Sequence, residues 1–266
     1  MINLNTSSNS SLLQQVQQKQ NSLMEKLASG KRVNSAADDA AAQQIIDRLT
    51  SQVEGTSRAM SNAYDGVSLS QVAEGGLSGI TEDAQRIREL TVQAGNGIYS
   101  AADRKAIQSE ISQLQGNISQ TIENTEFAGK KLLTEDGSAD FLVGANSGNT
   151  LSVNTSNIAS GISDLLSIDV SDASSIDDAL SAADSAIDYV DSTRADLGAT
   201  QNQFESAARN LSQANVNQAA ARSRLQDTDY AQATSDSASA NILSQSSLAV
   251  QVQSNQSKGQ VLSLLG

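Results

Sequence analysis

The chain has 266 residues, a formal net charge of −13, and no Cys, His, Pro or Trp. Without Cys and His it lacks disulfides, thiol chemistry, HExxH zinc sites and the Ser-His-Asp and Cys-His arrangements of hydrolases. These exclusions favour a structural protein over an enzyme, and we predict no catalytic residue, metal site or cofactor.

The charge is unevenly distributed along the chain. Residues 1–42 carry four basic and three acidic side chains, and residues 228–266 carry one basic and two acidic, so the two ends together are neutral. The whole negative charge lies between them, and residues 132–193 contain eleven acids and no Lys or Arg. Such a field disfavours nucleic acid and anionic membranes, whereas neutral ends suit burial against copies of the same chain.

Apolar residues spaced alternately three and four apart predict helices that pack along one stripe. A short first helix ends near Gly30, and a long second helix spans about 40–96. Its stripe changes register after Gly75 and Gly76, and the absence of Pro permits its length.

A third helix and a hairpin follow. Ser100 and Asp103 fit a capping box at the start of the helix, which fades near Gly129. The period then changes to two, and residues 141–143 and 151–153 flank a turn-rich stretch. We predict a β-hairpin there, the only strand region expected.

Residues 176–218 carry the strongest helical repeat. Thirteen positions keep a four-three alternation over 43 residues, which is typical of a coiled-coil seam. The apolar rod-seam residues are Ile176, Leu180, Ile187, Val190, Leu197, Phe204 and Leu211. Polar Arg194 on the same stripe costs stability but can fix the register.

The last segment, 228–266, has a weaker apolar periodicity, and a helix formed by it alone would be only marginally stable. It resembles residues 1–42 in composition and charge, so we expect the two chain ends to pair, fully only inside an assembly. The predicted polymerisation residues are Leu23, Leu27, Leu248, Val252, Leu264 and Leu265. The fold class is therefore mainly α, with long antiparallel coiled-coil rods and one small β-hairpin region.

Four segments closely resemble bacterial flagellins. They are LASGKRVNSAADDAA at 27–41, QRIRELTVQA at 85–94, TEFAGKKLL at 125–133 and VLSLLG at 261–266. The resemblance implies a structural subunit that polymerises into the bacterial flagellar filament for swimming motility.

The resemblance also implies a domain organisation. Residues 1–42 and 228–266 would form a discontinuous inner-core coiled-coil domain, and residues 43–227 a rod domain with the hairpin. The family's variable outer domain is missing, since only 154–175 joins the hairpin to the last rod helix. The acidic stretch is then expected to form the exposed face of the filament.

Partners and localisation follow from the same resemblance. The protein is expected to be extracellular, exported by the flagellar type III apparatus without a cleaved signal peptide, and partnered mainly by copies of itself. An export chaperone, the filament cap and hook-junction proteins are the other implied partners.

One segment matches the stretch that innate flagellin receptors recognise in related proteins. The candidate contact residues are Gln85, Arg86, Arg88, Glu89 and Leu90. Arg86 and Leu90, four apart, are expected to share a helix face. The alternative is a contact between neighbouring subunits, and Asn117 stands where recognised relatives carry an acid.

Adjacent acids invite a metal-site interpretation that spacing disfavours. Asp38 and Asp39 diverge around a helix, so they are expected to complement the dipole in the first turn of the long helix. Ser174 or Ser175 is expected to cap the later rod helix.

Two alternatives to a filament subunit stay open at this point. A hook–filament junction protein shares similar terminal helices but forms a short adaptor ring. A type III secreted coiled-coil protein acting on membranes would need an apolar insertion segment, and the sequence contains no such run.

Overall fold

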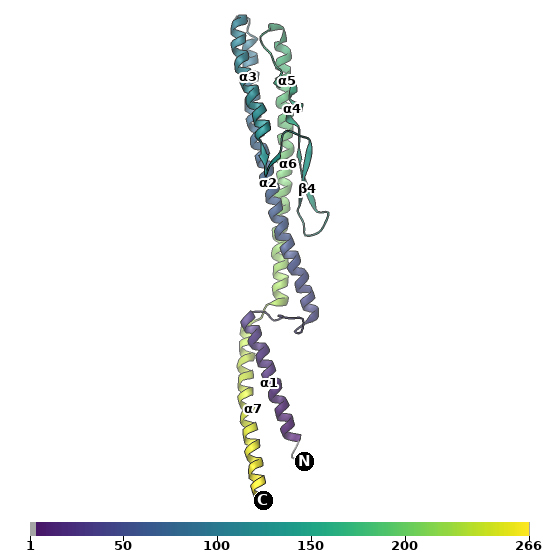
Figure 1. Ribbon diagram of the computed structural model, residues 1–266, viewed down its shortest axis with the longest axis vertical. Coiled ribbons are helices and arrows are strands. Elements are labelled where there is room, and N and C mark those ends of the chain that lie inside the picture. Colours follow the sequence, from purple (N-terminus) through teal and green to yellow (C-terminus); the bar gives the residue numbers. More distant parts are fainter. Residues whose placement is uncertain (1–3, 266) are drawn as a thin grey trace. The chain divides into compact units, whose positions relative to one another are not determined.

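The computed structural model describes the backbone of residues 4–265 and the side chains of residues 11–257, 259 and 260. The chain forms two compact units, Met1–Val53 with Val216–Gly266, and Glu54–Asn215. Two long helices, α2 (Ala40–Ala94) and α6 (Ile176–Gln226), contribute to both units (Figure 1). The mainly α fold class with long helices is confirmed. The domain boundaries expected at residues 42 and 228 are not those of the two units and stay a prediction.

The first unit contains the helices of both chain ends. Helix α1 (Leu4–Ser29) and helix α7 (Tyr230–Leu265) lie side by side and antiparallel. The segments that join them to α2 and α6 pair through an isolated antiparallel bridge between Lys31 and Asp227. Val33 beside this bridge is 1% exposed and packs in a small buried cluster with Ala42 and Ile46.

The start of α2 differs from the prediction for its two acids. Asp39 precedes the helix, and its Oδ1 accepts hydrogen bonds from the backbone N–H groups of Ala41 and Ala42. Asp38 closes the preceding turn by accepting from the N–H groups of Asn34 and Ser35. Neither acid lies in the first turn: Asp39 caps the helix from the position before it, and Asp38 bonds the turn ahead of it.

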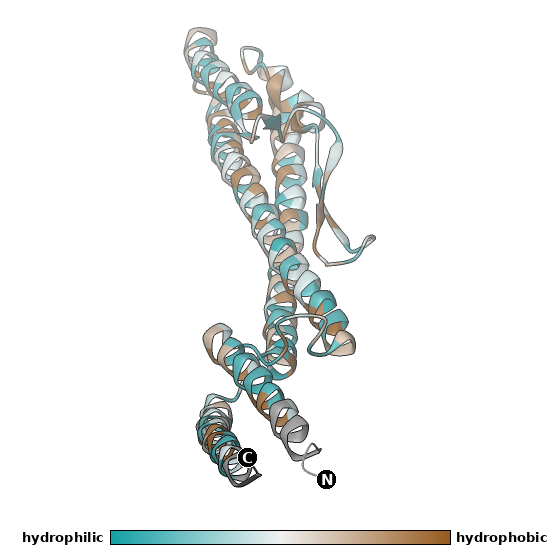
Figure 2. Ribbon diagram, turned by 60° about the horizontal axis from the view of Figure 1, so that its bottom comes forward, coloured by the Kyte–Doolittle hydropathy of each residue, from teal (hydrophilic) through white to brown (hydrophobic). Residues whose placement is uncertain are grey.

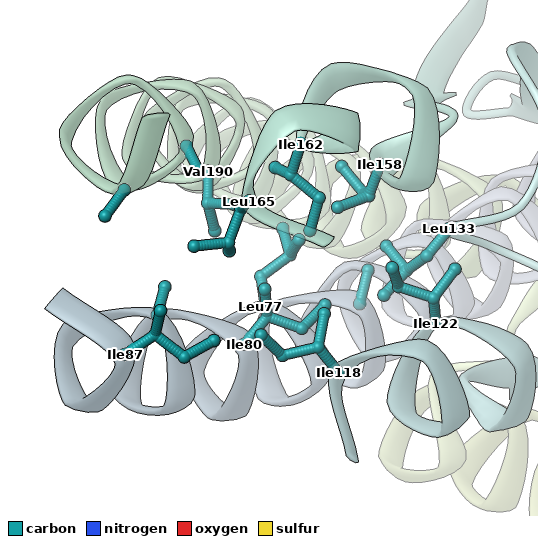
Figure 3. Close-up of a cluster of buried hydrophobic side chains, with 14 of the residues drawn as sticks. Leu77, Ile80, Ile87, Ile118, Ile122, Leu133, Ile158, Ile162, Leu165 and Val190 are labelled. Carbon is teal, nitrogen blue, oxygen red and sulfur yellow. The ribbon is translucent and has the colours of Figure 1, made fainter. Parts of the chain in front are cut away.

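The second unit has a continuous aliphatic core. Helix α3 (Ala101–Asn124) lies back along α2, and the predicted capping box of Ser100 and Asp103 is confirmed at its start (Figure 1). Figure 3 shows apolar side chains of α2, α3 and α6 converging with those of the segment between the strands and α6. The fully buried members include Leu77, Ile118 and Val190.

A tight hairpin that the sequence analysis did not predict follows α3. Strand β1 (Glu126–Phe127) pairs with β2 (Lys130–Lys131) around Ala128 and Gly129, both at positive φ. Positive φ at both central residues is the geometry of a two-residue hairpin turn. The helix therefore ends at Asn124 and does not fade toward Gly129.

The predicted larger hairpin is confirmed. Strand β3 (Gly137–Leu142) pairs antiparallel with β4 (Thr150–Thr155), and the Val143 N–H donates to the Asn149 carbonyl oxygen in the connecting turn. Phe141 of β3 meets Phe204 of α6 edge to face, with ring centroids 5.5 Å apart. This contact fixes the hairpin against the rod helices.

The segment that joins β4 to α6 is folded and packs its apolar residues into the core, while the expectation that the acidic stretch forms the exposed face of the filament stays a prediction. The segment folds into α4 (Ile158–Gly161), α5 (Ser163–Leu166) and the 3₁₀ turn η1 (Ala173–Ser175). Ile158, Ile162 and Leu165 are fully buried in the core. Their spacing of four and three is that of a helix, but three positions are too few to mark a helix in the sequence.

The start of α6 also differs from the prediction. Asp172 accepts from the N–H of Ser174 and so caps η1. The Ser175 hydroxyl donates to the carbonyl oxygens of Asp169 and Asp172, so it serves the loop and not the helix.

Candidate functional site

Polar contacts join the paired terminal helices and the residues that flank them. The Gln20 side-chain amide donates to the Asn241 side chain, and the Tyr230 hydroxyl donates to the Leu27 carbonyl oxygen at 2.7 Å. The Thr228 N–H donates to the carbonyl oxygen of Gly30 at 2.9 Å. The bonds of Tyr230 and Thr228 lie at the end where the two helices meet the rest of the unit, and the Gln20–Asn241 bond lies further along the pair.

The same pair buries little apolar surface. Among the described side chains of α1 and α7, the buried hydrophobic residues are Val16, Ala233 and Ala240. The large hydrophobic residues that the two helices leave exposed among these side chains are Leu12, Met24, Tyr230, Ile242, Leu243, Leu248, Val250 and Val252. Figure 2 shows hydrophobic positions interspersed with hydrophilic ones along these helices. Exposure of this extent is typical of a surface that another protein covers.

A groove lies between the two helices within this surface. Its volume is about 330 Å³, and its lining residues are Leu12, Ile242, Leu243, Ser246, Ser247 and Val250. Ile242 at its edge is 69% exposed. The lining is apolar with hydroxyl groups and carries no charge.

The predicted polymerisation residues fall in three groups. Leu23 and Leu27 of α1 are half-buried, and Leu248 and Val252 of α7 are exposed. Leu264 and Leu265 belong to α7, but their side chains lie outside the described residues. The structure thus brings Leu248 and Val252 to the surface of the helix pair.

The predicted receptor-contact segment divides between two sides of α2. The Arg86 guanidinium donates to Glu110 of α3 and to Glu89 on its own helix, at 2.9 and 3.0 Å. Arg88 pairs with Asp184 of α6. These ion pairs raise the pKa of both arginines, chiefly through the Glu110 and Asp184 side-chain hydrogen bonds. Arg86 and Glu89 therefore lie toward α3, Arg88 turns to α6, and Gln85 is exposed.

Leu90 was expected to share an exposed face with Arg86, and the structure contradicts this. Leu90 is 2% exposed and belongs to the core, because α2 is covered on that side. Asn117 is exposed on α3, but the acid facing Arg86 is Glu110, which the sequence reading missed. Their separation of 24 residues left no local signal for the pair.

The predicted rod-seam residues differ in burial. Val190, Leu197 and Phe204 are buried, and Ala183 and Ala208 on the same stripe are buried too. The half-buried seam residues are Ile176, Leu180, Ile187 and Leu211.

Arg194, the polar residue on this stripe, reaches across to α2. Its Nε and Nη2 donate to Oε1 of Glu74 at 2.9 and 2.8 Å, and this bond raises its pKa.

No group of three or more potential metal-ligating side chains occurs in the described part of the chain. Among the same residues, no helix combines the length and apolar character that crossing a bilayer requires. A concavity of about 450 Å³ lies beside α5 and α6, and its lining includes Asp164, Asp169 and Asp178.

Comparison with known proteins gives matches at both ends of the chain. Residues 2–138 match the bacterial flagellin N-terminal helical region, and residues 180–265 match the bacterial flagellin C-terminal helical region. The chain is 39% identical over 280 residues to flagellin from Bacillus subtilis (strain 168), with 91% of each chain covered. It is 38% identical over 259 residues to the flagellar filament 33 kDa core protein of Treponema phagedenis, again with 91% of each covered.

Two solved structures share the fold. Flagellin from Bacillus cereus is 23% identical, with a TM-score of 0.52 over 57% of this chain and 88% of that one. A protein from Vibrio parahaemolyticus described as flagellar hook-associated is 15% identical, with a TM-score of 0.61 over 71% of this chain and all of that one. At these identities the likenesses show the fold alone, which flagellins and hook-associated proteins have in common.

Long paired helices and matches at both chain ends define a filament-forming structural protein. The chain belongs to the bacterial flagellin family. It is a structural subunit of the flagellar filament. In the described chain only α4, α5 and η1 stand between β4 and α6, so no large outer domain is inserted there. The hook–filament junction and secreted-effector alternatives are not favoured.

Proposed function

We propose that α1 and α7, within residues 1–42 and 228–266, form the inner-core domain through which subunits polymerise. Residues 43–227 would then be the rod domain. The single observation that supports this division is the excess of exposed over buried apolar side chains on the terminal pair. Neutral net charge at the two ends permits close packing of many copies without mutual repulsion.

Leu248 and Val252 offer a direct test. They are 48% and 54% exposed, so replacing both with Gln leaves the packing inside the subunit unchanged. The double variant should keep the wild-type circular dichroism and thermal unfolding as a monomer, but fail to grow on filament seeds in electron micrographs. Ser239→Gln, at an exposed polar position of the same helix, is the matched control and should polymerise normally. Normal filaments from the double variant would reject the proposed surface.

We propose a second contact surface formed by Gln85, Arg86 and Glu89 with Glu110 of α3. These side chains are exposed and carry both charges, so they suit a neighbouring subunit or an innate flagellin receptor of a host. Arg86→Ala should weaken receptor activation in a reporter-cell assay more than Arg88→Ala, which changes the α6 side of the helix. Equal effects of the two variants would contradict the assignment.

We also infer the remaining partners from family membership. They are the export chaperone on α7, the filament cap and the hook-junction proteins. Export outside the cell without cleavage would leave residues 2–20 in the filament subunit, which intact mass measurement of secreted protein tests. We propose no enzymatic activity, since the chain has neither His nor Cys and carries a structural family's signature.

A further inference from the structure

At three places in the chain an Asp or Asn is followed directly by a glycine. They are Asp65–Gly66, Asn96–Gly97 and Asp136–Gly137. At such sites the backbone nitrogen of glycine can attack the side-chain carbonyl carbon of the preceding residue and close a five-membered succinimide ring. Glycine permits this because it has no Cβ to block the approach and restricts the backbone least. Whether the ring forms depends on whether the local structure leaves the two groups free to meet.

Two of the three sites are locked. Asp65 and Gly66 lie inside α2, and a Cβ at Gly66 would come within 2.6 Å of the Phe204 ring. Gly137 begins β3 and pairs with Thr155, while the Asp136 carboxylate accepts from the Asn157 N–H at 2.8 Å. Helix and strand hold both backbones in geometries that ring closure would have to break.

The third site lies in the short connection between α2 and α3. Asn96 and Gly97 are exposed, and a Cβ at Gly97 would meet nothing within 4 Å. Ile98 next to them is 81% exposed. The Gly97 N–H, which is the attacking group, makes no hydrogen bond to any residue that the structure describes.

The amide of Asn96 is also activated. Its Oδ1 accepts a hydrogen bond from the Ile98 N–H at 3.2 Å. Attack at Cγ places negative charge on this oxygen, and a backbone donor already aimed at it stabilises the charge as an oxyanion hole does. The Asn96 carbonyl oxygen is held in turn by the Tyr99 N–H at 3.0 Å, which keeps the connection ordered.

We propose that Asn96–Gly97 is a self-modification site at which the folded protein deamidates. The Gly97 nitrogen forms a bond to Cγ of Asn96, the Cγ–Nδ2 bond breaks, and the amide nitrogen leaves as ammonia with the proton lost by Gly97. Water then opens the ring at either carbonyl carbon and gives aspartate or isoaspartate. No oxidant, reductant or enzyme takes part.

The two products affect the connection differently. Aspartate keeps an oxygen that accepts from the Ile98 N–H and adds one negative charge beside the start of α3. Isoaspartate lengthens the backbone by one carbon, so the bonds to Ile98 and Tyr99 cannot both be kept. Modification thus places either a charge or a distorted turn next to the exposed Ile98 side chain.

Ageing the purified full-length protein at mildly alkaline pH tests the proposal. Tryptic peptide 89–104 should gain about one dalton, because ammonia leaves and water is added. Isoaspartyl methyltransferase with labelled S-adenosylmethionine should label this peptide several-fold more than peptides that contain Asp65 or Asp136. After unfolding in urea, labelling of the Asp65 and Asp136 peptides should rise because their backbones are then free, while the Asn96 peptide should stay the most labelled, since an amide is a better electrophile than an ionised carboxylate.

Two variants serve as controls. Gly97→Ala adds a Cβ into open space and should slow the mass change several-fold with unchanged circular dichroism. Asn96→Gln would require a larger ring and should also stay unmodified. Native protein that keeps an intact Asn96, or that labels all three sites equally before unfolding, would overturn the proposal.

Discussion

Phe204 shows how one side chain depends on residues far away in the sequence. It is fully buried, and its ring meets Phe141 of β3 edge to face. The ring fits only because residue 66 is a glycine, since a Cβ there would lie 2.6 Å from it. The chain has three Phe residues, and two of them meet in this contact between the hairpin and α6.

Phe204→Ala should therefore destabilise the folded subunit by about 3–5 kcal/mol, through lost burial and a cavity beside Phe141. Thermal or urea unfolding of the monomer measures this effect. Val216→Ala on the same helix is the control, because Val216 is exposed and its truncation should change stability by less than about 0.5 kcal/mol. Equal stability of the two variants would contradict the packing described for Phe204.

Aspartates that accept hydrogen bonds from backbone N–H groups make the stability of the fold depend on pH in the acid range. The hydroxyl and N–H of Ser100 lower the pKa of Asp103, and backbone N–H groups lower the pKa of Asp38, Asp169 and Asp172. A lowered folded-state pKa means that this stability is fully present above the ordinary Asp value of about 3.9 and is lost as pH falls through the folded value.

Urea unfolding between neutral and strongly acidic pH should thus show falling stability below about pH 4. Asp103→Asn should reduce the slope of that decline, and Ser100→Ala, which keeps the carboxylate but removes its hydroxyl partner, should give an intermediate slope. A slope unchanged by both variants would show that the capping box contributes nothing to acid sensitivity.

At the scale of elements, two ion pairs join α2 to α6, Arg88 with Asp184 and Arg194 with Glu74, and the second is the less exposed. Arg194 bonds Oε1 of Glu74 through two nitrogens, and the two side chains are 31% and 34% exposed. A slide of either helix by one turn would part them, since successive turns are about 5.4 Å apart. The pair therefore distinguishes the observed register from its neighbours.

Arg194→Ala should cost about 1–2 kcal/mol, below the value for fully buried pairs because solvent reaches a third of each side chain. A double-mutant cycle with Glu74→Ala isolates the interaction. Arg209→Ala is the matched control, since Arg209 pairs with Glu205 on an exposed face of α6 and should change stability by under about 0.5 kcal/mol. A coupling energy near zero for the Glu74 pair would remove it as a register marker.

The elements that sequence reasoning predicted are those with local signals. Hydrophobic periodicity predicted the long helices, and the turn residues around Gly148 predicted the β3–β4 hairpin. The four-residue α4 and α5 were missed, because two short turns supply too few positions for a period to stand out.

The site residues, too, were predicted only where the signal is local in the sequence. The exposed charged residues of 85–89 were recognised from their sequence, but Glu110 and Asp184 were not, because their partners lie 24 and 96 positions away. The burial of Leu90 was missed for a related reason. A four-residue spacing shows which helix face a side chain shares, but not which neighbour covers that face.

At the scale of the whole molecule, the two units differ in how completely they bury their apolar residues. The unit Glu54–Asn215 encloses an extensive aliphatic core, whereas α1 and α7 bury three hydrophobic side chains among their described residues. The unit Glu54–Asn215 is therefore suited to fold within one subunit, whereas α1 and α7 would bury more apolar surface by packing against other copies.

Deleting residues 255–266 should separate these two properties. None of the deleted residues belongs to the core of Glu54–Asn215, so its thermal unfolding should match that of the intact chain. Polymerisation on filament seeds should be lost, because α7 is shortened at the exposed end of the pair. A truncated chain that still forms filaments would contradict the role proposed for the terminal helices.

The sparse burial between α1 and α7 has a consequence for the two ends of a polymer. If copies supply the missing apolar contacts, a subunit at a free end has fewer of them and its terminal helices open more often. Short fragments, which have more ends for the same mass, should then exchange the amide hydrogens of α1 and α7 faster than long filaments. The amides of the Glu54–Asn215 core, which needs no neighbour, should exchange at the same rate in both.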